Sequence, residues 1–236
     1  MSDALAITAI SMNNDLLKLQ AISNNIANVN TPAFKRDLVQ IDNFSQRLSS
    51  HITAPLPLAS IMTDFSDGTL NVTGKPLDLA VAGENAFFEV STGQDIYYTK
   101  QGDFALDKFG RLVTSYGFIV NGENGEIRLT NDSPRIDAQG NIYEGNDLIG
   151  TLKIVEIPDL TNLNKLGKGL YEYVGTTITA AETVAVRQGF VEANNLSVPN
   201  EMVDMAELVK HFNSSQKVIQ GYNDMLDEAI SVLGNF

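Results

Sequence analysis

Residues 200–233, NEMVDMAELVKHFNSSQKVIQGYNDMLDEAISVL, decide the fold because they predict one long helix built to pair with another helix. Their apolar side chains recur at alternating steps of three and four, which is a seven-residue repeat. A helix packed on a globular core shows a broader stripe of period 3.6. The predicted seam positions are Met202, Met205, Val209, Phe212, Gln216, Ile219, Asn223, Leu226, Ile230 and Leu233.

The same repeat occurs at the other end of the chain, from residue 3 to about residue 28. Pro32 disfavours helical geometry at Thr31, so this helix should stop before it. Ser23 is the one polar seam member here, and Gln216 and Asn223 are its counterparts in the later helix. The predicted seam positions of the first helix are Leu5, Ala9, Met12, Leu16, Leu19, Ser23 and Ile26.

The middle of the chain reads as strands separated by turns. Leu77, Leu79 and Val81 alternate with residues that suit the other face of a half-buried strand. Asp107 to Gly110 and Asp137 to Gly140 are turn clusters flanked by apolar pairs. Short strands at this spacing favour one mostly antiparallel β domain and not βαβ units.

The predicted fold class is therefore α+β, with N- and C-terminal heptad helices that pair as a coiled coil around a central β domain. The alternative is that both helices pack on the β domain itself. Pro55 and Pro57 predict an extended connector after the first helix. The predicted segments are 1–36 for the N-terminal helix, 37–67 for the connector, 68–186 for the β domain and 187–236 for the C-terminal helix.

Composition excludes several classes of partner. The 236 residues carry a formal net charge of −13 and show no basic stripe, which argues against nucleic-acid binding. No stretch approaches the ~20 apolar residues of a membrane span, so we expect no direct membrane insertion. The N-terminus lacks the features of a cleaved signal peptide. Because cysteine is absent, disulfides, thiolate nucleophiles and cysteine-based zinc sites are excluded.

A search for chemistry gives no residue with a catalytic pattern. His51 and His211 are the only histidines, and neither has a local partner at metal-ligand spacing. No nucleophile elbow, phosphate-binding loop or dinucleotide fingerprint is present. The predictions are no catalytic residue, no cofactor, no metal and no enzyme activity. Two rivals stay open: an enzyme built on a β scaffold in the periplasm, and a soluble binding module.

Several blocks in order resemble the family of flagellar rod, hook and hook-associated proteins. The first runs from Ser23 to Lys35, and further blocks cover residues 68–88, 98–113, 189–195, 201–205 and 225–226. Ala33 stands where family members usually have glycine, so this turn cannot use glycine's conformational freedom. The family-motif residues are Asn24, Asn25, Ala27, Asn28, Thr31, Phe34 and Lys35.

The resemblance implies a structural subunit of the basal-body rod, which spans the periplasm. Chain size favours a proximal-rod member, with a distal-rod member as the alternative. The implied partners are further copies of the chain in a helical polymer, other rod proteins and the flagellar type III export apparatus. Asn24, Asn25 and Asn28 are expected either to bind backbone between subunits or to cap and end the first helix.

Overall fold

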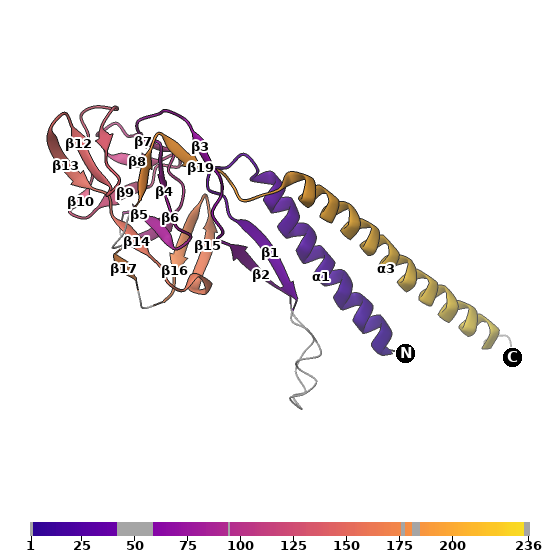
Figure 1. Ribbon diagram of the computed structural model, residues 1–236. Coiled ribbons are helices and arrows are strands. Elements are labelled where there is room, and N and C mark those ends of the chain that lie inside the picture. Colours follow the sequence, from indigo (N-terminus) through magenta and orange to yellow (C-terminus); the bar gives the residue numbers. More distant parts are fainter. Residues whose placement is uncertain (1, 42–58, 94, 176–177, 181–184, 234–236) are drawn as a thin grey trace. The chain divides into compact units, whose positions relative to one another are not determined.

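The computed structural model describes residues 2–41, 59–93, 95–175, 178–180 and 185–233, and these residues form an α+β fold (Figure 1). Helix α1 (Ser2–Ala27) stands near one end of the chain and helix α3 (Val198–Leu233) near the other, with strands between them. The α+β class and the two terminal helices are thus confirmed. His51, Pro55 and Pro57 fall outside the described residues.

The chain divides into two compact units, which we call the helical unit and the β unit. The helical unit takes residues 1–27, 37–62 and 197–236, and the β unit takes residues 28–36 and 63–196. This division differs from the predicted segments on both sides, because residues 28–36 and 187–196 belong to the β unit. Residues 190–192 form strand β19, and helix α3 begins at Val198, close to the predicted helix of residues 200–233.

The largest sheet lies in the β unit and has ten strands among the described residues. Its strand order is β15-β16-β6-β5-β9-β8-β7, with β10 beside β9, β14 beside β5 and β17 beside β14. Every register described in it is antiparallel. The strands are β5 (Ala86–Thr92), β6 (Asp95–Thr99), β7 (Phe104–Leu106), β8 (Leu112–Thr114), β9 (Ile119–Gly122), β10 (Gly125–Glu126), β14 (Ile154–Glu156), β15 (Leu163–Gly167), β16 (Leu170–Tyr173) and β17 (Thr179–Ala180).

Smaller sheets complete the strand pairing. Strands β11, β12 and β13 form an antiparallel sheet, while β18 pairs with β4 and β19 pairs with β3. Strand β1 pairs with β2. Their bounds, with the short 3-10 helix η1, are β1 (Arg36–Ile41), β2 (Ala59–Asp64), β3 (Leu70–Val72), β4 (Leu79–Val81), β11 (Arg135–Ile136), β12 (Asn141–Glu144), β13 (Asp147–Thr151), η1 (Leu160–Asn162), β18 (Val186–Gln188) and β19 (Phe190–Glu192).

Strand β5 lies between two hydrophobic clusters of the β unit. Phe87 and Phe88 are adjacent and both fully buried, because successive side chains of a strand point to opposite faces. Phe88 belongs to the larger cluster with Leu79 and Leu112, whereas Phe87 packs in the smaller cluster with Tyr171. The half-buried alternation predicted around Leu79 and Val81 is wrong, because all three residues of β4 are buried.

In the helical unit, α1 and α3 lie side by side and run antiparallel, so the start of α1 and the end of α3 are at the same end of the pair (Figure 1). Within the described residues, neither helix carries an apolar stretch long enough to cross a bilayer.

Candidate functional site

The side chain of Asn25 joins three segments of the helical unit. Its Oδ1 accepts a hydrogen bond from the backbone N–H of Asp37 at 2.9 Å, and its Nδ2 donates to the carbonyl oxygen of Asp37 at 2.9 Å. The same Nδ2 donates to Oε2 of Glu201 at 3.2 Å, and the Asn25 side chain is almost fully buried. One amide thus ties the end of α1 to the start of β1 and to the first turn of α3.

The neighbouring asparagines act locally. Asn24 donates from Nδ2 to a carboxylate oxygen of Asp37 at 2.8 Å. Asn28 accepts the backbone N–H of Thr31 at 3.0 Å and the Thr31 hydroxyl at 3.3 Å, which ends the helix as a turn. Of the two expected roles, Asn25 therefore binds backbone, but within its own chain, and Asn28 ends the first helix.

A second polar contact joins the two long helices further from this point. Nδ1 of His211 lies 2.6 Å from Oδ2 of Asp15. The Asp15 side chain is buried and the His211 side chain is more than half exposed. The sequence showed no partner for His211 at metal-ligand spacing and gave no sign of a contact with Asp15.

Some members of the predicted seams are half-buried like the rest of the surface where α1 meets α3, whereas others are exposed and lie one position away from its buried residues. The buried residues of this surface are Asn14, Asp15, Ala21 and Asn25 on α1, and Glu201 and Leu208 on α3. Met12, Leu19 and Ile26 of α1, and Met205, Phe212 and Ile219 of α3, are half-buried. The exposed members of the predicted seams are Ala9, Leu16, Ser23, Met202, Val209, Gln216, Asn223, Leu226 and Ile230, and the side chains of Leu5 and Leu233 fall outside the described residues.

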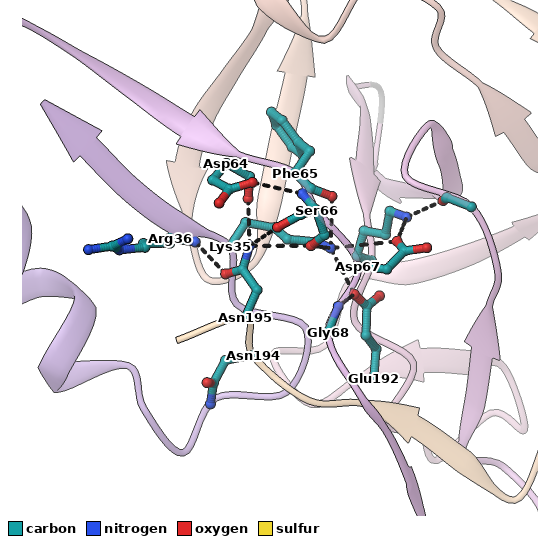
Figure 2. A network of polar contacts seen from close by, with 12 residues as sticks. Lys35, Arg36, Asp64, Phe65, Ser66, Asp67, Gly68, Glu192, Asn194 and Asn195 are labelled. Carbon is teal, nitrogen blue, oxygen red and sulfur yellow. Dashed lines mark hydrogen bonds and ion pairs between the residues drawn. The ribbon is translucent and has the colours of Figure 1, made fainter. Parts of the chain in front are cut away.

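In the β unit, the family-motif residue Lys35 is completely buried in a network of oxygen atoms (Figure 2). Its Nζ lies 2.7 Å from Oε1 of Glu192 and donates to the carbonyl oxygens of Phe65 at 3.1 Å and Ser66 at 2.8 Å. A buried charge is tolerated only where it is paired and hydrogen-bonded, and here both conditions hold. The motif lysine therefore fixes residues 65–66 and strand β19 to the segment that follows α1.

A second buried lysine stands beside the first. Nζ of Lys100 lies 3.4 Å from Oδ1 of Asp67, which is also 3.9 Å from Nζ of Lys35. Lys100 donates as well to the carbonyl oxygen of Gly83. Burial lowers the pKa of Lys100, and the positive charge of Lys35 lowers it further. Such an amine could react as a nucleophile, but Lys100 is 1% exposed and closed to a substrate.

Asn194 and Asn195 bind the same two segments from the C-terminal side of β19 (Figure 2). Asn195 accepts the backbone N–H of Arg36 at 2.8 Å and donates to the carbonyl oxygen of Asp64 at 2.9 Å. Asn194 donates to the carbonyl oxygen of Val29. The stretch after α1 and the stretch before α3 are therefore held against each other inside the β unit.

The turn that presents Lys35 uses an unusual backbone conformation. Ala33 has a φ of 52°, and its N–H donates to the carbonyl oxygen of Glu192 at 2.8 Å. Left-handed geometry costs a non-glycine residue roughly 1–2 kcal/mol. Ala33 thus keeps the conformation that the family's usual glycine would adopt freely. The next residue, Phe34, packs its ring under Nζ of Lys165 at 3.8 Å from the centroid.

The remaining motif residues differ in exposure: Ala27 is exposed and Thr31 is half-buried. Sequence reasoning did not assign roles to Asp67 or Lys100, whose partners come from distant segments. It quoted Glu192, Asn194 and Asn195 only as part of a family block. Among the described residues, no group of three or more His, Asp or Glu side chains is arranged to hold a metal ion. The arrangement joins segments that are distant in the chain.

Three family models match the chain in succession. The flagella basal body rod protein model covers residues 8–35 and so contains Asn25 and Lys35. The flagellar hook protein FlgE/F/G D1 domain model covers residues 80–159 in the β unit. The flagellar basal body rod FlgEFG protein C-terminal model covers residues 187–232 and so contains Glu192, Asn195 and α3.

Curated relatives match nearly the whole chain. The flagellar basal-body rod protein FlgG of Bacillus subtilis is 30% identical over 94% of this chain and 95% of its own length. FlgF of Caulobacter vibrioides is 28% identical over 92% of each chain, and FlhO of Bacillus subtilis, a flagellar hook-basal body complex protein, is 26% identical. These matches confirm the predictions of a structural rod component in the flagellar basal body and not an enzyme. The chain belongs to the flagellar basal-body rod protein family.

Proposed function

We propose that this chain is a proximal-rod subunit of the FlgF type, and that it assembles with neighbouring subunits through its terminal helices. Family membership is common to FlgF and FlgG, so the finer assignment rests on chain length. The alignment to the Bacillus FlgG has 256 positions and includes about 222 residues of this chain. About 34 positions of that alignment therefore contain no residue of this chain. The alignment to the Caulobacter FlgF spreads about 217 residues over 231 positions and leaves about 14.

The observation that carries the assembly proposal is an apolar stripe on each helix that its partner helix in the same chain does not cover. Leu16 on α1 and Met202 and Val209 on α3 are exposed by 52%, 58% and 42%. They belong to the predicted heptad seams, one position away from the polar surface where α1 meets α3. A second copy carries the complementary stripe, so the contact can be repeated from subunit to subunit.

Helix α3 is also longer than its partner, with 36 residues against 26 in α1. Facing residues of the two helices have numbers that add up to 226, as in the pairs Asp15–His211 and Asn25–Glu201. Ser2 therefore lies opposite residue 224, and residues 225–233 extend past the start of α1. Leu226 and Ile230, exposed by 42% and 66%, continue the line of Ile219 and Tyr222 in this extension.

The proposed occupant of the extension is the terminal helix pair of the next subunit, either a second copy or another rod protein. A stripe on one subunit that meets a different stripe on the next is a heterologous contact, which generates open helical assemblies. In that assembly the terminal helices would pack as coiled coils, as their heptad spacing predicts. Export through the flagellar type III apparatus is part of the same proposal and follows from the family alone.

Substitution in the α3 extension tests the assembly proposal. With Leu226→Asp and Ile230→Asp together, we expect the isolated chain to keep its thermal stability, because these side chains are already exposed. Cells carrying this variant should lack complete rods and should not swim. Met225→Asp is the matched control, since Met225 is 52% exposed on the same turn but points away from the seam line. Normal rods in the double variant would refute the assembly proposal.

Complementation separates the proximal from the distal assignment. The gene is introduced into cells of its own species that lack either the proximal or the distal rod protein, and rods are then counted in isolated basal bodies. Rescue of the proximal deletion alone is the expected result. Rescue of the distal deletion alone would transfer the chain to the FlgG type and leave the helix-mediated assembly intact.

A further inference from the structure

Two polar contacts between α1 and α3 share one geometric property. Asp15 and Asn25 are ten residues apart on α1, and their partners His211 and Glu201 are ten residues apart on α3. Because the helices are antiparallel, both pairs are in register only for one alignment of the two helices. Ten residues of helix are about 15 Å, so the contacts fix the alignment at two well-separated points.

We infer that the contacts of Asp15 with His211 and of Asn25 with Glu201 set the register of the terminal helix pair. The heptad pattern alone cannot set it, since an apolar stripe of seven-residue period repeats after every slip of seven residues. The polar members of the predicted seams are Ser23, Gln216 and Asn223. All three are exposed in the structure and lie away from the surface where α1 meets α3.

A slip of α3 along α1 by seven residues is unfavourable in either direction. A slip of seven residues one way places Asp15 opposite Val218 and Asn25 opposite Leu208. A buried polar group that loses its hydrogen-bond partner costs about 1–3 kcal/mol, and a charged group costs more. A slip the other way brings Asp15 opposite Asp204 and places Asn25 opposite residue 194, which precedes the first residue of α3. Of these three alignments, only the observed one places His211 opposite Asp15 and Glu201 opposite Asn25.

The degree of burial makes these contacts selective. The side chains of Asp15, Asn25 and Glu201 are buried, so water cannot replace their partners after a slip. Asn25 is held further by both backbone groups of Asp37, which fixes the orientation of its amide. Between the two contacts, Ala21 and Leu208 are buried and supply apolar packing. Such packing adds stability without selecting among heptad slips.

Register has a direct consequence for the part of α3 that extends past α1. A slip of seven residues moves that extension by about 10 Å and changes which side chains it presents. Fixed polar contacts therefore define where the extension begins. The inference concerns the isolated chain and stands whether or not the extension binds a neighbour as proposed above.

Cross-linking between introduced cysteine pairs can report the register of the two helices, because the natural chain contains no cysteine. Ser11 and Ser215 have numbers that add up to 226, and both are half-buried, so Ser11→Cys with Ser215→Cys reports the observed alignment. Lys18→Cys with Ser215→Cys reports a slip of seven residues. In the otherwise natural purified chain, we expect mild oxidation to cross-link the first pair at least tenfold more than the second.

The triple variant Asp15→Leu, Glu201→Leu and His211→Leu removes the polar selection and adds apolar area. We expect the preference for the Ser11–Ser215 cross-link to fall at least tenfold while the helix content is kept. The control is Glu207→Leu with Lys210→Leu, which adds the same kind of side chain on the outer face and should keep the preference. An unchanged preference in the triple variant would show that apolar packing sets the register.

An exchange of the two side chains tests the same inference in a variant that alters only Asp15 and His211. His211→Asp places two carboxylates opposite each other and should lower the preference for the Ser11–Ser215 cross-link. Adding Asp15→His to that variant recreates the pair in reverse and should restore the preference. A merely structural effect of His211→Asp would not be repaired from α1, so failure of the restoration would overturn the inference.

Discussion

The ammonium group of Lys35 lies 2.7 Å from a carboxylate oxygen of Glu192, a residue 157 positions further along the chain. Both side chains are buried, and the carboxylate also accepts the backbone N–H of Gly68 at 2.8 Å. One ion pair thus joins the segment after α1, the segment before β3 and the last strand of the β unit. The contact gives the motif lysine its role, because its charge is paired with Glu192 inside the β unit.

Removal of one charge of the Lys35–Glu192 ion pair should destabilise the fold far more than removal of both charges. Lys35→Met leaves Glu192 as an uncompensated buried charge, and we expect a loss of about 3–5 kcal/mol in unfolding free energy. Adding Glu192→Gln removes that charge while keeping an acceptor for Gly68, so part of the loss should be recovered. Urea unfolding of the natural chain, of the single variants Lys35→Met and Glu192→Gln and of the double variant gives the coupling free energy between the two side chains. Losses that simply add would mean that the two groups do not stabilise each other.

Position 33 should accept glycine and reject a β-branched residue. Ala33 has a φ of 52°, a region that β-branched side chains adopt only under strain. Ala33→Val should therefore lower the unfolding free energy by about 2 kcal/mol or more. Ala33→Gly should stay within about 1 kcal/mol of the natural chain, because relief of strain is offset by greater freedom of the unfolded chain. Equal stability of the two variants would contradict this assignment.

Gly68 should be intolerant of any side chain. A Cβ atom at this position would lie 2.0 Å from the carbonyl oxygen of Ala193, which is backbone and cannot move aside. We expect Gly68→Ala to lower the thermal midpoint markedly. Gly221→Ala is the control, because a Cβ there meets no atom within 4 Å and lies inside α3, where alanine favours the helix by roughly 1 kcal/mol. Similar midpoints for both variants would count against the structure at residues 68 and 193.

The hairpin turn at Asp137 should make part of the stability depend on pH. Burial alone would raise the pKa of this carboxyl, but hydrogen bonds from the Asn141 side chain and from the backbone N–H groups of Asn141 and Gln139 lower it below its usual value. A carboxyl with a lowered folded-state pKa stabilises the fold above its unfolded pKa of about 3.9. This contribution is lost as the pH falls through the lower, folded value.

The test compares the natural chain with Asp137→Asn. At pH 7 the natural chain should be the more stable, because the carboxylate accepts these bonds better than an amide. Towards pH 3 the difference should shrink, since the carboxyl becomes protonated. Urea midpoints at both pH values measure it. A difference that is constant between pH 7 and pH 3 would show that the charge of Asp137 has no part in the turn.

The sequence by itself determined the existence of the two long helices, the β nature of the middle and the family. Heptad spacing, alternation and turn clusters are local patterns, and local patterns are sufficient for these conclusions. The turns at Asp107 and Asp137 were also predicted from local sequence. The structure has hairpins at both places, since β7 pairs with β8 and β11 pairs with β12. The family motif likewise marked Asn25 and Lys35 as important without saying what they bind.

Only the tertiary structure decided what those residues contact. Lys35 meets Glu192, Asn25 meets Asp37 and Glu201, and Asp15 meets His211, and no periodicity links residues so distant in the chain. The exposure of predicted seam positions such as Leu16, Met202 and Val209 had the same origin. Apolar spacing predicted the seams, but buried hydrogen bonds between polar side chains are lost if the helices turn, so these bonds selected the face that each helix presents to the other.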